Sequence, residues 1–363
     1  MSAFAIYRLP REDHYTLVEQ TIGEPLELSS ISELNGRSGF VLAPFAISAD
    51  QPLLLIRGDR VIKEKVIENS ENQAKVPSPF GEGGGRGSLR EVYHKDFANF
   101  YAHLLSGEFR KIVLARSVTL NSPLTAHHSL RELFFDACQR YPRMFICLVS
   151  TPKSGMWLTA TPEILLSNEK GMWQTMALAG TMKLEGDDLQ GEGEHLLWST
   201  KNIQEQRIVA SYITECLEQF ADDFTEKGPY TVRAGNLVHL RSDFTFTLSD
   251  EQHMGDVLTA LHPTPAVCGL PKRATFDFIL QNEHSTRRYY SGFMGPLRLQ
   301  CTMSSTHQSP ATTHLYVSLR CMEVLTNGFK LYAGGGLLSD SVEEQEWQET
   351  EAKMETMRNL LYI

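Results

Sequence analysis

Two carboxylates and a lysine share one face of the helix that the sequence predicts over about residues 343–361. Glu346, Glu349 and Lys353 follow the spacing i, i+3, i+7, which places them on the same side of a helix. Such a set is either a solvated charged face or a site for a hard cation such as Mg²⁺. The glycines at 334–336 lie just upstream, and they indicate either a tight turn or a backbone that can approach an anion closely.

Several isolated ionisable residues occupy positions where burial would change their chemistry. Lys111 opens an apolar strand, and it is either a candidate general base pointing inward or a surface lysine with a buried stem. Glu163 follows a proline within an apolar stretch, so it is either a protonated general acid or a turn carboxylate. Arg320 interrupts a strand, and an inward arginine needs an anion partner. Taken singly, the position of Glu205 on a predicted helix indicates a solvated carboxylate, and the position of His239 in a predicted strand indicates a structural histidine.

The composition narrows the class of protein. The chain has 363 residues, of which 42% are hydrophobic, and its formal net charge of −10 argues against a nucleic-acid-binding surface. It contains no apolar run near the roughly 18 residues that a membrane helix needs, and its start does not resemble a signal peptide. The six cysteines form no CxxC pair, which argues against a zinc or redox motif. We therefore expect a cytoplasmic protein with reduced thiols.

The elements that must position these residues are mostly strands. Successive strands follow one another as hairpins more often than they alternate with single helices, which favours an antiparallel α+β fold. The pattern predicts a strand-rich part at 1–66, a flexible Gly- and Pro-rich loop at 67–88, and no linker within 89–363. Beyond residue 88, the predicted strands are 111–120, 145–150, 157–167, 172–181, 229–248, 289–299, 314–325 and 328–338, and the predicted helices are 89–107, 128–140, 199–220, 251–260, 271–283 and 343–361.

Seven motifs occur in a fixed order along residues 89–360. They are KIVLAR (111–116), TATPEILLS (159–167), ALAGT (177–181), LHPTPAVCG (261–269), YSGFMG (290–295), VSLRC (317–321) and AGGGLLSDSVEEQEWQETEAK (333–353). Together they resemble the chorismate-binding enzyme family, which includes isochorismate synthases, salicylate synthases, anthranilate synthase large subunits and aminodeoxychorismate synthases. The resemblance implies one large domain of mainly antiparallel sheets packed together and flanked by helices. In it, 89–363 is the catalytic region and 1–66 belongs to the same fold.

A few positions indicate the subgroup. HPTPAVCGLPK (262–272) is similar to isochorismate synthases, and Lys111 stands where ammonia-using members usually have Gln. Ala179 stands where aminodeoxychorismate synthases typically have a nucleophilic lysine. The resemblance therefore implies an isochorismate synthase. The alternatives are a salicylate synthase, an ammonia-using synthase with a glutaminase subunit, and a non-catalytic chorismate-binding protein.

The resemblance also implies roles for individual residues. Mg²⁺ would bridge the ring carboxylate of chorismate to Glu205 and Glu349, with Glu346 close by. Lys111 would be the general base and Glu163 the general acid. The remaining substrate-binding residues would be Gly180, His239, Ala266, Val267, Tyr290, Arg320, Gly334 and Lys353.

The chain departs from the family pattern at two places that bear on the site. Asn202 replaces an aspartate that often follows the lysine on the Glu205 helix, and Arg288 replaces the usual glycine before Tyr290. We expect chorismate and isochorismate as ligands, no nucleic acid, no membrane, no obligatory glutaminase subunit and a monomer. Residues 67–88 and 182–194 are both candidates for a lid. Isochorismate feeds menaquinone, siderophore and salicylate synthesis, and the sequence favours none of these.

Overall fold

Two large antiparallel sheets form the body of the protein. The computed structural model describes residues 3–66, 81–82, 86–121, 129–184, 196–248, 253–300 and 311–361. One sheet has ten strands, ordered β15-β8-β19-β18-β10-β9-β1-β2-β6 with β7 beside β8, and the other has nine, ordered β13-β14-β12-β11-β17-β16-β4-β5-β3. Every strand pairing in both sheets is antiparallel, so the predicted α+β class is confirmed.

The strands have the following bounds. The ten-stranded sheet contains β1 (Ala3–Arg8), β2 (His14–Gln20), β6 (Arg60–Lys65), β7 (Gly81–Glu82), β8 (Lys111–Asn121), β9 (Phe145–Thr151), β10 (Gly155–Thr161), β15 (Gly269–Leu270), β18 (Cys321–Leu325) and β19 (Gly328–Leu337). The nine-stranded sheet contains β3 (Leu26–Leu28), β4 (Gly39–Ala43), β5 (Leu53–Ile56), β11 (Ile164–Glu169), β12 (Met172–Lys183), β13 (Phe224–Ala234), β14 (Leu237–Phe246), β16 (Phe293–Leu297) and β17 (Thr313–Val317).

Six α-helices and one short 3₁₀ helix complete the secondary structure of the described residues. They are η1 (Ile31–Leu34), α1 (Arg86–Leu105), α2 (Leu130–Arg140), α3 (Thr200–Leu217), α4 (Met254–Leu261), α5 (Lys272–Asn282) and α6 (Glu343–Leu361). Ser129 caps α2; its hydroxyl accepts from the Glu132 amide, and the Glu132 carboxylate accepts from the Ser129 amide. None of the helices in the described part of the chain is long and apolar enough to cross a membrane.

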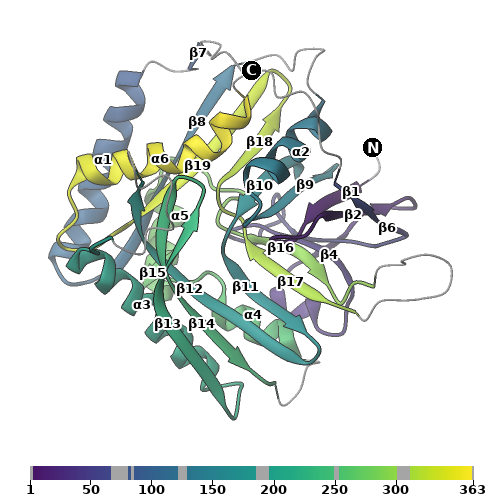
Figure 1. Cartoon of the computed structure of the whole chain (residues 1–363). Coiled ribbons are helices and arrows are strands. Elements are labelled where there is room, and N and C mark those ends of the chain that lie inside the picture. Colours follow the sequence, from purple (N-terminus) through teal and green to yellow (C-terminus); the bar gives the residue numbers. More distant parts are fainter. Residues whose placement is uncertain are drawn as a thin grey trace.

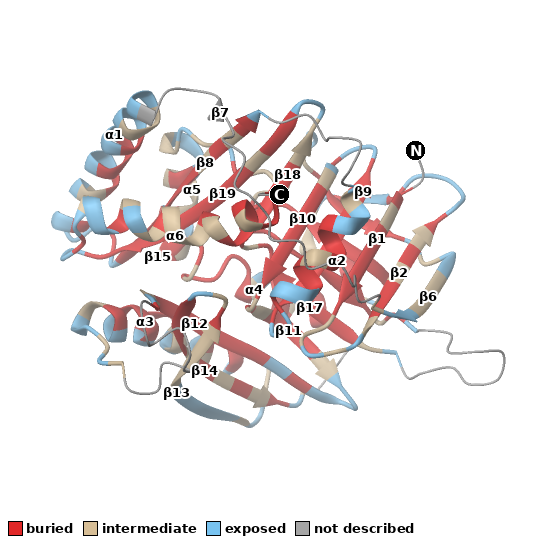
Figure 2. Cartoon of the chain, turned by 45° about the horizontal axis from the view of Figure 1, so that its top comes forward, coloured by how far each residue is buried: buried red, intermediate tan, exposed pale blue. Residues whose placement is uncertain are grey.

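The sheets pack face to face, and helices cover their outer faces. Aromatic and aliphatic side chains of both sheets fill the space between them, with Tyr7, Phe145 and Trp157 from one sheet and Phe40 and Tyr316 from the other. The Phe145 and Tyr316 rings stack across this layer with their centroids 4.3 Å apart. Buried residues dominate the strands, whereas the edge strands β6 and β13 and the outward helix faces are exposed (Figure 2).

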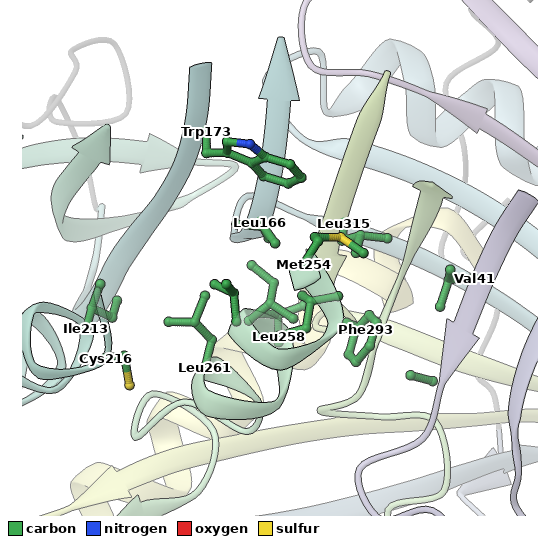
Figure 3. Packing of buried hydrophobic residues seen from close by; sticks show 14 of the residues in the cluster. Val41, Leu166, Trp173, Ile213, Cys216, Met254, Leu258, Leu261, Phe293 and Leu315 are labelled. Carbon is green, nitrogen blue, oxygen red and sulfur yellow. The ribbon is translucent and has the colours of Figure 1, made fainter. Parts of the chain in front are cut away.

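Helices α3 and α4 cover the outer face of the nine-stranded sheet. Figure 3 shows Met254, Leu258 and Leu261 of α4 packed beneath Trp173 and other residues of this face, with α3 alongside. On the other side, α2 and α6 cover the outer face of the ten-stranded sheet. Helices α1 and α5 pack around β8 (Figure 1). The apolar residues along one side of each of these helices are thus buried against a sheet.

Two segments that the sequence predicts as single strands are each divided between the two sheets. Segment 157–167 is β10 in one sheet and β11 in the other, and segment 314–325 is β17 and β18. Pro162 lacks an N–H for a strand ladder, and Arg320 adopts a left-handed φ of 45°, so neither segment continues as one strand. The chain crosses between the sheets at both points.

Other boundaries differ by a few residues. Helix α1 begins at residue 86, earlier than the predicted 89, and 81–82 form the short strand β7 inside the predicted loop. The rest of 67–85 and most of the predicted loop at 182–194 lie outside the described residues. In the predicted strand 289–299 only β16 (Phe293–Leu297) is extended, because residues 288–292 form turns.

Candidate active site

A cavity opens near the ends of β10, β12, β18 and β19. Ten of the thirteen residues that the sequence analysis singled out line it: Glu163, Gly180, Glu205, His239, Ala266, Val267, Tyr290, Arg320, Gly334 and Lys353. Lys111 is not among the lining residues, but it forms an ion pair with Glu205, which lines the cavity. Glu346 and Glu349 line a second cavity, which shares Thr181 with the first. The structure therefore brings the predicted residues together in two neighbouring cavities.

The two crossings between the sheets place Glu163 and Arg320 at this cavity. The Val317 amide donates to the Glu163 carbonyl at 3.0 Å, and the Ala160 amide donates to the Arg320 carbonyl at 3.1 Å. Each crossing is thus hydrogen-bonded to the other. Both side chains are buried, with 2% of Glu163 and 6% of Arg320 exposed.

Glu163 is held in its neutral form. Burial raises the pKa of its carboxyl to about 8, and three nearby cations oppose this shift only in part. A carboxyl group with such a pKa carries a proton at neutral pH. It can therefore donate that proton within the cavity.

His239 and Arg320 form a pair whose hydrogen bonds fix the histidine tautomer. Arg320 Nη2 lies 2.6 Å from His239 Nε2, and a guanidinium can only donate, so Nε2 is the acceptor. The other ring nitrogen, Nδ1, therefore carries the proton and donates to the Gly180 carbonyl at 2.9 Å. Burial, helped by the charge of Arg320, keeps the pKa of His239 well below its ordinary value, so the ring is neutral.

Arg320 retains a free donor at the cavity. Burial lowers the pKa of its guanidinium to about 10, which leaves it charged at neutral pH. Its Nη1 is buried without a hydrogen-bond partner among the described residues. A buried charged donor of this kind is costly unless an anion binds it.

The glycines of β19 leave room for the buried ion pair of the site. A Cβ on Gly336 would lie 2.1 Å from Glu205 Oε1 and 2.9 Å from Lys111 Cε. A Cβ on Gly334 would lie 2.9 Å from the Tyr290 hydroxyl. The absence of side chains at 334 and 336 is therefore what allows Lys111, Glu205 and Tyr290 to reach the same space.

Lys111 points inward and pairs with Glu205. Its side chain is fully buried at the start of β8, and Nζ lies 2.9 Å from Glu205 Oε1 in an ion pair that lacks hydrogen-bond alignment. The Gly180 amide donates to the other oxygen, Oε2, at 3.2 Å. Burial disfavours the ionised form of Glu205, but the charges of Lys111 and Lys201 outweigh this effect and lower its pKa. Glu205 is thus a charged carboxylate.

Helix α6 presents two more carboxylates, and each has a lysine beside it. Lys353 Nζ donates to Glu349 Oε1 at 2.6 Å and to the Gly334 carbonyl at 2.9 Å. Lys201, on α3, donates to Glu346 Oε1. Burial and the charge of Glu349 raise the pKa of Glu346 to about 7, although Lys201 opposes this. Burial would lower the pKa of Lys201, but the surrounding carboxylates reverse the effect and raise it.

The donor set at α3 and α6 fits a hard divalent cation by its chemistry. Glu205, Glu346 and Glu349 supply only carboxylate oxygens, which Mg²⁺ prefers. Glu346 Oε2 is buried and has no hydrogen-bond partner within the described residues, so one oxygen is free for a cation. In the described ranges no three His, Cys, Asp or Glu side chains are gathered closely enough to hold a metal, and each of the three carboxylates is paired with a lysine.

The turn after α5 supports the cavity wall. Arg287 is buried, pairs with Glu283 at 2.6 Å, and donates to the Val267 and Val113 carbonyls at 2.7 and 2.9 Å. It thus connects two residues that line the cavity. The neighbouring Arg288 has a left-handed φ of 53°, which explains why a glycine suits this position.

Sequence reasoning missed some contributors to the site. Lys201 was not singled out, although it precedes Glu205 by four residues and so lies on the same helix face, a signal that the sequence does contain. Tyr332 also lines the cavity, and its ring stacks on Tyr290 with centroids 5.5 Å apart. Tyr332 lies in a strand with no distinguishing motif, so nothing in the sequence indicated it.

The sequence is similar to a known family of enzymes. The family model described as "Chorismate binding enzyme" matches residues 55–362. Isochorismate synthase MenF of Escherichia coli (strain K12) is 31% identical over 72% of this chain and 58% of its own length. Isochorismate synthase DhbC of Bacillus subtilis (strain 168) is 31% identical over 82% of this chain and 72% of its own length. The chain thus spans less than two thirds of the E. coli relative.

Solved structures share the fold. The menaquinone-specific isochorismate synthase MenF of E. coli superposes with a TM-score of 0.76 at 22% identity, covering 99% of this chain and 89% of that one. Anthranilate synthase component I of Streptococcus pneumoniae superposes with a TM-score of 0.70 at 16% identity, covering 98% and 90%. These structures support the architecture of two packed sheets flanked by helices.

Proposed function

The chain belongs to the chorismate-binding enzyme family, and from this premise we propose that it is an isochorismate synthase. Such an enzyme adds water at C2 of chorismate and releases the hydroxyl from C4. The observation that carries the proposal is the fully buried Lys111, whose Nζ lies 2.9 Å from Oε1 of Glu205, a residue that lines the cavity. A lysine here, and not the glutamine usual in ammonia-using members, supplies a base for water.

The base and the acid stand at the same cavity. Water is a weak nucleophile and hydroxide is a poor leaving group, so the reaction needs a proton acceptor and a proton donor. We assign Lys111 to take the proton from water as it attacks C2, after its ammonium group, which pairs with Glu205 in the free protein, has released its own proton. The ring double bonds then shift, and Glu163, protonated at neutral pH, gives its proton to the departing C4 oxygen.

The carboxylates of the substrate need cationic partners, because the protein itself carries a net charge of −10. Arg320 has an unpartnered Nη1 at the cavity, and we assign it with the backbone near Gly334 to the enolpyruvyl carboxylate. Lys353 also lines the cavity and adds positive charge near the substrate. Gly180, His239, Ala266, Val267 and Tyr290 complete the substrate contacts.

We assign Glu205, Glu349 and Glu346 to hold Mg²⁺, which when bound supplies positive charge for the ring carboxylate of the substrate. We also propose that the protein acts in the cytoplasm as a monomer, without a glutaminase subunit. The rival within the family is a salicylate synthase, which would go on to eliminate pyruvate. Ala179, which lines the cavity without an amine, disfavours an aminodeoxychorismate synthase.

The decisive experiment incubates the purified protein with chorismate and MgCl₂ in the absence of ammonia, with and without EDTA, and separates the products by chromatography. We expect isochorismate in equilibrium with chorismate, and no turnover in EDTA. The Lys111→Gln variant should lose this activity, whereas Lys153→Gln, at an exposed turn, should retain it.

Three outcomes would contradict the proposal. Salicylate with pyruvate would identify a salicylate synthase. Turnover only with ammonium would identify an ammonia-using synthase. Chorismate binding without turnover under either condition would indicate a binding protein. Near-normal isochorismate formation by Lys111→Gln would refute the role of Lys111 as base.

A further inference from the structure

Lys201 differs from the other two lysines of the site. Lys111 and Lys353 reach their carboxylates from beside the substrate cavity, and Lys353 lines it. Lys201 instead lines the second cavity, together with Glu346 and Glu349, although its side chain is 17% exposed, as is that of Lys353. Its ammonium group therefore approaches the carboxylates from outside the cavity that the proposed function assigns to the substrate.

The partner of Lys201 is the most buried carboxylate of the set. Only 1% of the Glu346 side chain is exposed, its Oε1 accepts from Lys201, and its Oε2 has no partner among the described residues. The ion pair joins α3 to α6, which also carry Glu205 and Glu349. Lys201 thus neutralises a carboxylate that the proposed function assigns to a divalent cation.

The charges of the site balance as it stands. Glu205, Glu346 and Glu349 each have one lysine beside them, so three carboxylates face three ammonium groups. A dication that entered while all three lysines stayed would leave two uncompensated positive charges in a largely buried space, where charge is costly. Withdrawal of one lysine reduces this excess, and Lys201 can withdraw into the second cavity without entering the substrate cavity, which Lys353 lines.

We propose that Lys201 is a tethered counter-cation that competes with the divalent cation for Glu346, and so sets the metal affinity of this protein. The proposal rests on the proposed function for the identity of the metal ligands. The next residue, Asn202, is a neutral amide and offers the ammonium group of Lys201 no alternative carboxylate. In this chain the hydrogen bond of Lys201 goes to Glu346.

The test measures metal binding without substrate, so it does not depend on turnover. Mn²⁺ is titrated into the wild-type protein and into Lys201→Met, and the free ion is followed by electron paramagnetic resonance. Methionine keeps an unbranched apolar stem but removes the charge. We expect Lys201→Met to bind Mn²⁺ about tenfold or more tightly, since a competitor is gone, whereas the charge-matched control Lys153→Met should bind as the wild type does.

A second measurement uses the wild-type protein, so the test does not depend on the folding of a variant. Each lysine is labelled by reductive methylation and quantified by mass spectrometry, with and without MgCl₂. We expect the metal to increase labelling of Lys201 and to leave the exposed Lys153 unchanged. Release of the ammonium group from Glu346 is the cause of the expected increase.

The contradicting outcomes separate the two proposals. Equal or weaker Mn²⁺ binding by Lys201→Met, or labelling of Lys201 that does not rise with MgCl₂, would refute competition while leaving the proposed function intact. In that case Lys201 would hold Glu346 in place for the metal or have no influence on it. Failure of both proteins to bind Mn²⁺ or Mg²⁺ would refute the metal assignment of the proposed function as well.

Discussion

Glu163 and Glu205 are two carboxyl groups that line the same cavity and are both buried, yet they differ in charge. Burial raises the pKa of Glu163 to about 8, so it is neutral at pH 7. Burial acts on Glu205 in the same direction, but Lys111 lies 2.9 Å from its Oε1 and the pKa of Glu205 is lowered. Within the described residues Glu163 has no ion-pair partner, which accounts for the difference.

This contrast separates the cavity into two ends with different chemistry. The end at α3 and α6 is a set of charged pairs, suited to hold a cation and an anionic substrate. The end at the two crossings holds a neutral acid, a neutral histidine and one arginine with a free donor. For Glu163 and Glu205, which are both buried, the position of Lys111 decides which carboxyl group can act as an acid.

The largest expected effect comes from a change at Glu163, in the end of the cavity at the two crossings. Glu163→Gln removes the proton donor but keeps the shape and the lack of charge, so isochorismate formation should fall by about 10²–10⁴ while the fold remains. Initial rates and thermal unfolding would measure both. Glu169→Gln, at an exposed position on the neighbouring strand, should keep wild-type rates. Near-normal turnover by Glu163→Gln would remove Glu163 from the mechanism.

At the charged end, the expected effect is on stability. Lys111→Met leaves Glu205 buried without its nearest cation, and such a change costs about 3–5 kcal/mol of unfolding free energy. Urea denaturation in EDTA would measure it. The double variant Lys111→Met with Glu205→Gln should recover most of the loss. A single variant as stable as the wild type would show that the pair does not hold the charge of Glu205.

The absence of a side chain at Gly336 leaves room for the ion pair of Lys111 and Glu205. In Gly336→Ala the new Cβ would lie 2.1 Å from Glu205 Oε1, so the carboxylate must move, and we expect a loss of about 1–3 kcal/mol. Urea denaturation and Mn²⁺ titration would detect the strain and the displaced ligand. Gly87→Ala, in α1 with no atom within 4 Å of the added Cβ, is the control and should not weaken either property. Unchanged stability and Mn²⁺ affinity in Gly336→Ala would contradict the close approach.

The two carboxyl groups also predict a difference in the pH dependence of stability. The ordinary pKa of Glu163 is 4.5 and its folded-state value is about 8, so between these values the folded protein retains a proton that the unfolded chain releases. Its contribution to stability is therefore complete below pH 4.5 and is lost as the pH rises toward 8, by at most about 1.4 kcal/mol per pH unit. The unfolding free energy of the wild type, relative to Glu163→Gln, should fall across this range. Parallel profiles would mean that Glu163 is not neutral in the folded state.

The sequence predicted the content of the site better than its geometry. Alternation along β8 indicated that Lys111 could point inward, and helix spacing placed Glu346, Glu349 and Lys353 on one face. The ordered motifs indicated the family. These signals are local or ordered along the chain, so a sequence can carry them.

The crossings between the sheets could not be predicted in this way. Segments 157–167 and 314–325 are mostly apolar, and periodicity alone does not show that a strand stops in one sheet and resumes in the other. The pairing of Lys201 with Glu346 joins residues 145 positions apart, and no local pattern reports such a contact. The sequence therefore did not predict the long-range contacts that place these residues in the fold.

The position of the first strands has a consequence for the order of folding during synthesis. Strand β1 lies inside the ten-stranded sheet and pairs with β9, and β4 lies inside the other sheet, where Ala43 pairs with Phe293. Because Ala43 pairs with Phe293, the ribosome synthesises β4 about 250 residues before its partner strand β16. The apolar strands of the first 66 residues must therefore wait for much of the chain to emerge, and their edges stay open to non-native pairing in the meantime.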